Sequence, residues 1–137
     1  MAVQLSVAVR NARLDAIETT IGATAVLKLY DLTAGAPADC AAAITATTVS
    51  TITLPADWMA AASSGAKAKS GTWQDTVADN TGTLDFWRLF ASDGTTCGAQ
   101  GTITATGGGG DMTVDNTSVT AGQSITITGF TLTDANA

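Results

Sequence analysis

Apolar residues recur at every second position in several separate stretches of this 137-residue chain, and this spacing constrains its fold more than any other feature. Leu27 and Leu29 flank Lys28, and the same alternation returns at Ile52 and Leu54. Successive side chains of a β-strand point to opposite faces of the sheet, so the pattern indicates strands with one buried face. We therefore expect a mainly β protein.

Turn residues divide the chain into about seven such strands. Asp93-Gly94 is a strong hairpin signal, because this dipeptide supplies the positive φ angles of a tight turn, and another turn is expected at Ala121-Gly122. The strands beyond residue 54 are predicted around Trp73, at 84–90, through 101–106, at 112–114 and from the second turn to residue 133. Short strands at this spacing are typical of an antiparallel β-sandwich, immunoglobulin-like or jelly-roll.

The last predicted strand contains an irregularity. Ile125 and Ile127 share one face, whereas Phe130 and Leu132 fall on the opposite face. One extra residue in a strand reverses the alternation, and glycine tolerates the backbone of a β-bulge. A bulge at Gly129 is therefore predicted, and it would turn all four side chains into the core.

Residues 6–21 are predicted to form an amphipathic helix ahead of the strands. Ser6 is a suitable N-cap, and Gly22 stands where helices commonly end. The apolar stripe is expected to pack on the strands or on a neighbouring subunit, and it consists of Val7, Leu14, Ile17 and Ile21. The chain is thus expected to be a single domain over 1–137, with a helix at 6–21 and a β-sandwich at 24–133.

Three connecting segments are predicted to be irregular or short. Glycine, proline and aspartate make residues 31–43 a loop. After Pro55, Asp57 is expected to cap a short helical turn in DWMAAA, and SSGAKAKSGTWQDT is expected to be a flexible connection.

The charge of the chain limits its partners. Only 13% of its residues are charged, against about 25% in ordinary soluble domains, and 26 alanines, 25 threonines and 14 glycines dominate it. This composition suits a surface covered by partners, and it equally suits a β-domain with threonine on its outer faces. The net charge of −6 argues against nucleic acid and against an acidic membrane surface. The sequence has neither an apolar run of membrane-spanning length nor the pattern of a signal peptide, so synthesis in the cytoplasm is expected.

The stretch TATGGGGDMTVDN, residues 104–116, raises three alternatives. A phosphate loop would need Lys and Ser or Thr after the glycines, and here Asp111 follows them. Asp111, Thr113 and Asp115 have the spacing of the first calcium ligands of an EF-hand, but Asn116 and Gly122 replace the required Gly and Glu. The glycines are therefore interpreted as a connector between two strands, and no metal or cofactor is expected.

Catalysis is not expected either. The chain has no histidine, which removes the commonest general base, and most of its aspartates lie in predicted turns. Cys40 and Cys97 are too few for a structural zinc site, and a disulfide between them is possible but not required. Trp58, Trp73 and Trp87 could form a sugar-binding platform, although tryptophans are more often core or interface residues.

Three segments in order carry a resemblance: SVAVRNARLDAIETTIGA, DWMAAASSGAKAKSGTWQDT and GTITATGGGGDMTVDNTSVTAGQSITITGFTLT. Together they resemble small structural virion proteins of tailed bacteriophages. The resemblance covers nearly the whole chain and implies a non-enzymatic virion component assembled in the host cytoplasm. A capsid decoration or cement protein that binds and stabilises the head lattice is favoured; a neck, tail or fibre-associated protein is the alternative, as is a carbohydrate- or receptor-binding module.

A structural role implies partners and contact residues. The expected partners are the major capsid protein or other virion proteins, together with further copies of the chain in a homo-oligomer, and neither nucleic acid nor membrane is expected. The candidate subunit contacts are Val7, Arg10, Arg13, Leu14, Ile17, Ile21 and Trp58.

Overall fold

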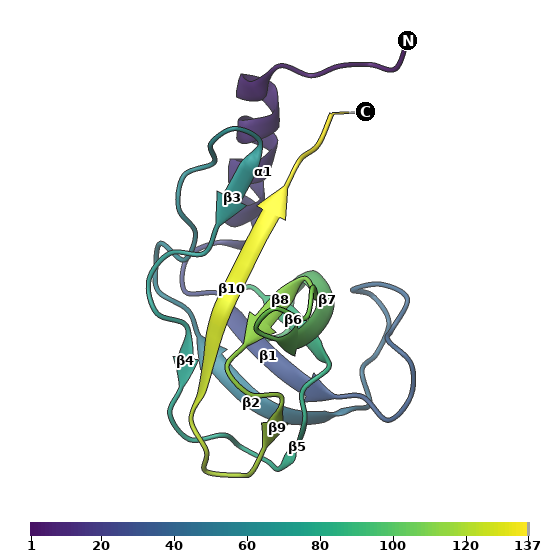
Figure 1. The fold of residues 1–137 in the computed structure, drawn as a ribbon, viewed down its shortest axis with the longest axis vertical. Helices are drawn as coiled ribbons and strands as arrows, with labels where there is room; N and C mark the ends of the chain where they lie inside the picture. The colour runs from purple at the N-terminus through teal and green to yellow at the C-terminus, as the bar shows by residue number, and fades with distance from the viewer. Residues whose placement is uncertain (137) are drawn as a thin grey trace.

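The computed structural model describes residues 1–136, which form one N-terminal helix and ten strands (Figure 1). In chain order the elements are α1 (Val7–Ile21), β1 (Val26–Asp31), β2 (Thr47–Thr53), β3 (Ala66–Ala68), β4 (Gln74–Asp75), β5 (Gly82–Thr83), β6 (Phe86–Phe90), β7 (Cys97–Ala105), β8 (Met112–Val114), β9 (Ser118–Val119) and β10 (Ile125–Thr133). The mainly β character and the N-terminal helix are confirmed.

Most of the strands belong to one mixed sheet. Its order is β2-β1-β6-β7-β8-β10-β3, with β4 also paired to β10, and β5 and β9 form a small second sheet. All pairs are antiparallel except β7 and β8, which run parallel. The prediction of a uniformly antiparallel arrangement is therefore wrong at this pair.

The glycine run makes the parallel pair possible. It connects β7 to β8, as predicted, and places Met112 beside Ile103, so the chain returns within a few residues. Gly107 and Gly109 have φ angles of 87° and 80°, which glycine adopts without strain. A Cβ atom on Gly108 or Gly110 would lie within 3 Å of the Thr104 side chain.

The bulge predicted in the last strand is confirmed. The register of β10 against β8 shifts between Ile127 and Gly129. Ile125, Ile127 and Phe130 are buried, and Leu132 packs partly buried against the core. The Phe130 ring lies 5.2 Å from the ring of Trp87 and 5.5 Å from that of Trp73, so the bulge positions an aromatic cluster.

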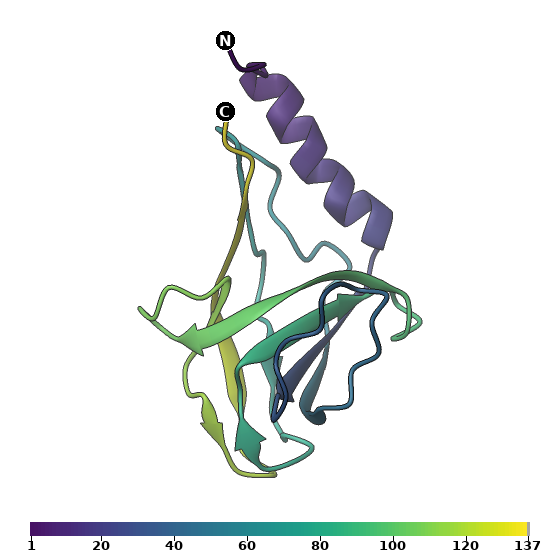
Figure 2. The same cartoon turned by 90° about the vertical axis from the view of Figure 1, so that its right-hand side faces the viewer.

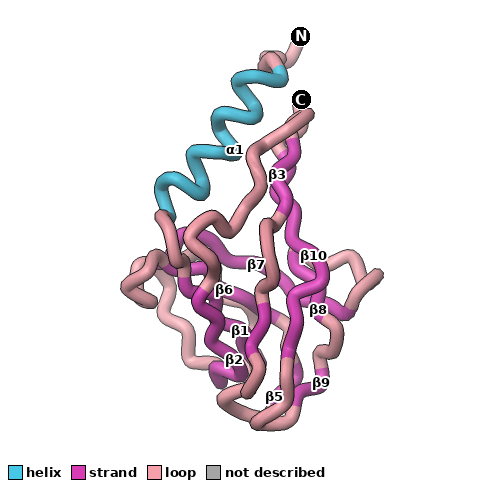
Figure 3. The backbone as a smooth tube through the Cα atoms, turned by 90° about the vertical axis from the view of Figure 1, so that its left-hand side faces the viewer, coloured by secondary structure: helices cyan, strands magenta, loops and turns pink. Residues whose placement is uncertain are grey.

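The helix has the predicted ends. The Ser6 hydroxyl accepts a hydrogen bond from the Val9 amide, and the Gly22 amide donates to the Glu18 carbonyl at the other end. Figure 3 shows α1 running alongside β3 and rising from the body of the sheet together with β10.

Polar side chains hold this helix in place. Lys67 of β3 is 3% exposed, and its Nζ donates to Asp15 Oδ1 at 2.7 Å, to Glu18 Oε2 at 3.0 Å and to the Ala60 carbonyl at 2.9 Å. A buried ammonium is costly unless it is paired and hydrogen-bonded, as it is here. Asn11 of α1 adds a further contact, because its Oδ1 accepts a hydrogen bond from the Gly65 amide.

The predicted apolar stripe is therefore only partly correct. Leu14 and Ile21 are buried and Ile17 is partly buried, but Val7 is 47% exposed. Polar residues outside the predicted stripe, Asn11, Asp15 and Glu18, form the junction instead. The reason is that the facing segment, residues 58–67, presents backbone N–H groups and a lysine rather than an apolar surface.

Two predictions about that facing segment are wrong. No helical turn forms at 57–62, because Met59 donates its amide to Glu18 and pairs as a β-bridge with Lys69. The segment expected to be a flexible connection contains the hairpin from Ser63 to Ala66 that leads into β3. Both errors arise because the segment is organised by α1, which is distant in sequence.

Truncating Phe130 to alanine tests the bulge. We expect the free energy of unfolding to fall by about 3–5 kcal/mol, because a buried ring that contacts two tryptophans is lost. Denaturant titration of Phe130→Ala measures this loss, and Thr131→Ala, on the exposed face of the same strand, is the control. A loss below about 1 kcal/mol would contradict the burial of this side chain.

The Lys67 junction predicts a specific response to acid. Hydrogen bonds from Lys67 and from the Ala62 amide hold the pKa of Asp15 below its ordinary value of 3.8. Burial alone would lower the pKa of Lys67, but its hydrogen bonds to Asp15 and Glu18 outweigh burial and raise it above 10.5. A carboxylate with a lowered pKa stabilises the fold above 3.8, and this contribution is lost as the pH falls through the lowered value.

Asp15→Asn should therefore be less stable than the wild type near pH 7, and the difference should shrink as the pH falls below 3.8. Thermal unfolding of both proteins between pH 7 and pH 2 measures it. Asp57→Asn, at an exposed position outside the junction, is the matched control. A difference that stays constant over the whole range would show that the charge of Asp15 does not contribute.

Candidate functional site

A groove lies between α1, β7 and β10. In Figure 2, α1 and the end of β10 rise as two arms and β7 crosses below them. On one side of these arms α1 contacts β3. The groove is therefore bounded by one helix and two strands from different parts of the sequence.

Three adjoining hollows make up the groove. One of about 440 Å³ is lined by α1 and the start of β7, and one of about 300 Å³ is lined by α1 and the end of β10. These two share Arg13 and Ile17. The third, of about 330 Å³, shares Thr133 with the second and extends over Trp87 and Phe130. The partly buried apolar side chains Ile17, Ala99 and Leu132 all line the groove.

Glycine at position 98 allows the helix to approach the sheet at the groove's lower end. A Cβ atom at Gly98 would lie 2.5 Å from Ile21 Cγ1 and 2.7 Å from Ile21 Cδ1. With any other residue at this position, the Ile21 side chain or the helix would have to shift.

Two strand edges face the groove without a partner strand. In the part of the chain that the structure describes, β8 pairs with β7 only from Ile103 and with β10 only as far as Phe130, because β8 begins at Met112. The Ile103 amide donates to the Asp85 carbonyl, just before β6, and the Thr102 amide donates to Asp111 on the other side, so the even-numbered peptide groups of β7 face the groove. At the end of β10, the Phe130 carbonyl accepts a hydrogen bond from the Lys69 amide, and the Asp134 amide donates to the Gly65 carbonyl, both on the β3 side. Peptide groups alternate in direction along a strand, so those of Thr131 and Thr133 face the groove.

Each outer edge of the large sheet has at least one backbone hydrogen bond to a neighbouring loop. Beside β2, the Val49 carbonyl accepts from the amides of Asp79 and Asn80. Beside β3, the Ala60 amide donates to the Ala68 carbonyl. Uncovered edges are sites where further strands pair, and two such edges face the groove.

The polar groups of the groove are few. Arg13 forms an ion pair with Asp134 at 3.2 Å, and its side chain is 61% exposed, so this pair stabilises little. Asp111 accepts hydrogen bonds from the amide and the hydroxyl of Thr102 through Oδ2, both at 2.9 Å. The Trp87 indole Nε1 is buried and has no hydrogen-bond partner among the described residues.

The predicted contact residues fall into three groups. On the groove side of α1, Arg13 is exposed, Ile17 is partly buried, and Leu14 and Ile21 are buried in its floor. Arg10 of α1 donates a hydrogen bond to the carbonyl of Asp134, just after β10, at 2.8 Å. Val7 is exposed near the tip of the helix.

The prediction that Trp58 is a subunit contact is corrected by the structure. The side chain is fully buried, and its Nε1 donates to the Gly22 carbonyl at 3.0 Å. Trp73 is also fully buried, 6.1 Å from Trp58 between ring centroids. Neither ring is available to a neighbouring subunit or to a sugar, because each fills the core at the point where α1 leaves the sheet.

Sequence patterns missed the β-strand walls of the groove. Leu132 was expected only as a core residue of the last strand, and Thr131 was not singled out. A signal does exist in retrospect: the predicted strand at 112–114 is much shorter than the strand at its side. A three-residue strand between two nine-residue strands leaves long edges unpaired.

The described residues contain no group of three or more His, Cys, Asp or Glu that could hold a metal ion. Asp111 and Asp115, from the calcium alternative, accept hydrogen bonds from protein groups of Thr102 and Thr126. Asp15, Lys67 and Asp93, whose pKa values are shifted, lie outside the groove. The pKa of Asp93 is lowered to about 2 by hydrogen bonds from Thr96 and Thr95 within the hairpin.

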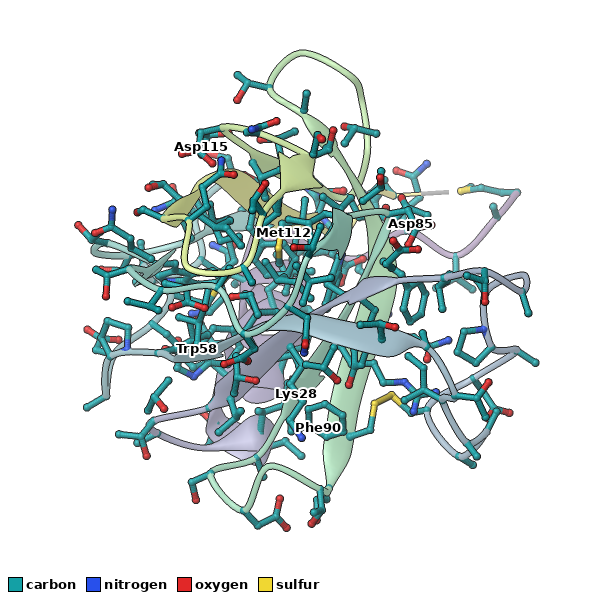
Figure 4. All side chains as sticks on the ribbon, turned by 90° about the horizontal axis from the view of Figure 1, so that it is seen from below. Lys28, Trp58, Asp85, Phe90, Met112 and Asp115 are labelled. Atoms are coloured by element: carbon teal, nitrogen blue, oxygen red, sulfur yellow. A yellow bond between two sulfur atoms is a disulfide. The ribbon has the colours of Figure 1, made fainter. Side chains whose placement is uncertain are left out.

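A disulfide holds a loop beside the groove. Cys40 of the loop 32–46 is bonded to Cys97 at the start of β7, with Cα atoms 5.5 Å apart, and Figure 4 shows this bond close to Phe90. Arg88, 4% exposed, holds the same loop by donating to the carbonyls of Asp39 and Ala42 at 2.9 and 2.8 Å. The loop is thus fixed by a covalent bond and by a buried guanidinium.

Replacing both cysteines by serine should lower the free energy of unfolding by about 2–4 kcal/mol, because the unfolded chain regains the freedom of a long closed loop. Denaturant titration with and without a reductant measures this. The reductant should destabilise the wild type and leave the double variant unchanged. An equal response of both proteins to the reductant would contradict the bond.

α1 has 15 residues, and no helix in the described part of the chain is long and apolar enough to cross a membrane. Comparison with protein-family models, with curated proteins and with solved structures finds no match to this chain. The fold and the groove are therefore the basis on which a function is proposed.

Proposed function

We propose that this chain is a non-enzymatic structural subunit of a bacteriophage virion, specifically a decoration or cement protein that binds the major capsid lattice and stabilises the head. The observation that carries the proposal is the exposed face of α1. This face is almost free of charge and consists of Ala8, Val9, Ala12, Arg13, Ala16, Thr19 and Thr20. A helix face of small and apolar side chains packs closely against another protein.

The position of this face supports a role in assembly. The helix rises from the sheet together with the end of β10, so its outer surface is held away from the body (Figures 1 and 2). Val7 and Val9 near its N-terminal end are 47% and 46% exposed. The Lys67 junction fixes the helix on one side, which leaves the other side as a rigid surface for a neighbour.

The body of the protein suits a module on an outer surface. We interpret the curled sheet with its small second sheet as a sandwich-like domain, in which the fully buried rings of Trp58 and Trp73 fill the interior. Because both rings are buried, a tryptophan platform for carbohydrate has no support, and the receptor-binding alternative is not pursued. A neck, tail or fibre position is the rival placement of the same structural role.

The test compares two alanines that are each replaced by glutamate. Ala12→Glu places a charge on the exposed face of α1, and Ala121→Glu places the same charge in the exposed turn before β10. We expect both variants to keep the wild-type thermal transition, because both positions are exposed. Ala12→Glu should reduce the copy number on purified particles severalfold, and Ala121→Glu should not.

Quantitative mass spectrometry of the particles gives the copy number, and cryo-electron microscopy gives the position. Density on the capsid lattice supports decoration, and density at the neck or tail places the subunit there instead. A wild-type chain that is missing from purified particles would overturn the virion role. Normal incorporation of Ala12→Glu would show that the contacts lie elsewhere.

A further inference from the structure

We infer that the Cys40–Cys97 disulfide closes after the chain has folded, and that it fixes a loop which Arg88 and Gln100 have already placed. The protein then has two redox forms of the same shape: a dithiol form, and a disulfide form in which the loop 32–46 is fixed covalently. The inference concerns the fold itself and holds whether or not the subunit is carried by a virion.

One side chain bonds the loop on both sides of Cys40. Arg88 Nη2 donates to the carbonyl of Asp39 at 2.9 Å and to the carbonyl of Ala42 at 2.8 Å. Hydrogen bonds from an ionised donor are stronger than those between neutral groups. Asp39 Oδ1 also accepts from the amides of Ala41 and Ala42, at 2.9 and 3.0 Å, which closes a turn around the cysteine. Cys40 is therefore held by contacts that do not involve its sulfur.

A second side chain connects this loop to the strand that carries the other cysteine. Gln100 of β7 lies opposite Arg88 in the β6–β7 pair. Its Oε1 accepts from Arg88 Nε at 2.9 Å, and its Nε2 donates to the Pro37 carbonyl at 2.9 Å. Cys97 begins the same strand, three residues earlier. The two residues that hold the loop thus also set its position relative to Cys97.

These contacts determine the order of events. In a reducing compartment cysteines stay as thiols, and none of the hydrogen bonds to the loop requires the sulfur–sulfur bond. Groups that are already held in the right geometry react as though they were highly concentrated. The folded dithiol form therefore presents Cys40 to Cys97, and the disulfide forms when the protein meets oxidising surroundings.

The closing reaction is an exchange with a small-molecule disulfide, such as oxidised glutathione. One cysteine thiolate attacks a sulfur of the reagent and releases one small thiol, and the second thiolate then attacks the mixed disulfide and releases the other. Two electrons pass to the reagent, and the two protons of the cysteine thiols end on the two released thiols. Cys40 and Cys97 are each only partly buried, so a reagent of this size reaches them in the folded protein.

The redox equilibrium of the full-length protein tests the inference. The protein is held in mixtures of reduced and oxidised glutathione, and the disulfide fraction is measured by alkylating the free thiols and weighing the products by mass spectrometry. The folded wild type should favour the disulfide about 30- to 1000-fold more than the chain unfolded in denaturant, which is the stabilisation expected of this bond written as a ratio.

Replacing Arg88 tests its part in placing the loop. Arg88→Lys keeps the charge but loses the planar guanidinium that reaches two carbonyls, so it should lower the folded-state equilibrium constant for closure about tenfold. The value in denaturant should stay that of the wild type. Arg10→Lys makes the same replacement at an arginine that bonds the Asp134 carbonyl, away from the loop, and should change neither value. Gln100→Met, which removes the bond to Pro37, should act in the same direction as Arg88→Lys.

NMR spectra of the reduced wild type give a readout that needs no variant. We expect the amide signals of Ala41 and Ala42 to keep nearly the same positions in the dithiol and disulfide forms. Signals of these amides at random-coil positions in a reduced protein that is otherwise folded would overturn the inference, because the disulfide alone would then place the loop. Equal closure of the folded wild type, Arg88→Lys and Gln100→Met would overturn it as well.

Discussion

The buried ammonium group of Lys67 lies at the junction between α1 and β3, where it is bonded to Asp15, Glu18 and the Ala60 carbonyl. Removing any of these groups leaves a buried ammonium with fewer partners, which is more costly than never having buried it. The junction therefore specifies one orientation of the helix relative to the hairpin before β3. Everything above the body of the sheet depends on that orientation, including the exposed face of α1, the groove and the position of the N-terminal segment.

Local patterns in the sequence were sufficient for much of the fold. The helix ends at Ser6 and Gly22, the hairpin at Asp93-Gly94 and the bulge at Gly129 each depend on neighbouring residues, and each is present. The glycine connector was also predictable, but not the parallel pairing that it permits. Patterns fail where partners are distant in sequence. The polar docking of α1 required knowledge of what faces it, and the burial of Trp58 follows from the same junction.

The candidate site was predictable only on its helical side. Ile17 and Arg13 could be named because the spacing of residues along a helix shows which of them share a face. The strand walls could not be named without knowing the order of the strands in the sheet. Periodicity along one strand cannot show where its neighbour ends. The groove arises from such an end, since Met112 starts a strand too short to cover both β7 and β10.

The glycine loop before β8 has a consequence for how the sheet is kept incomplete. Every residue moved from that loop into β8 would cover another peptide group of β10 and shorten the exposed edge. Glycine is disfavoured in strands because it has no side chain to pack and much backbone freedom to lose. Four consecutive glycines therefore disfavour the extension of β8 toward the residues that precede it. The number of consecutive glycines thus limits the length of β8, and with it the length of the edge of β10 that stays exposed.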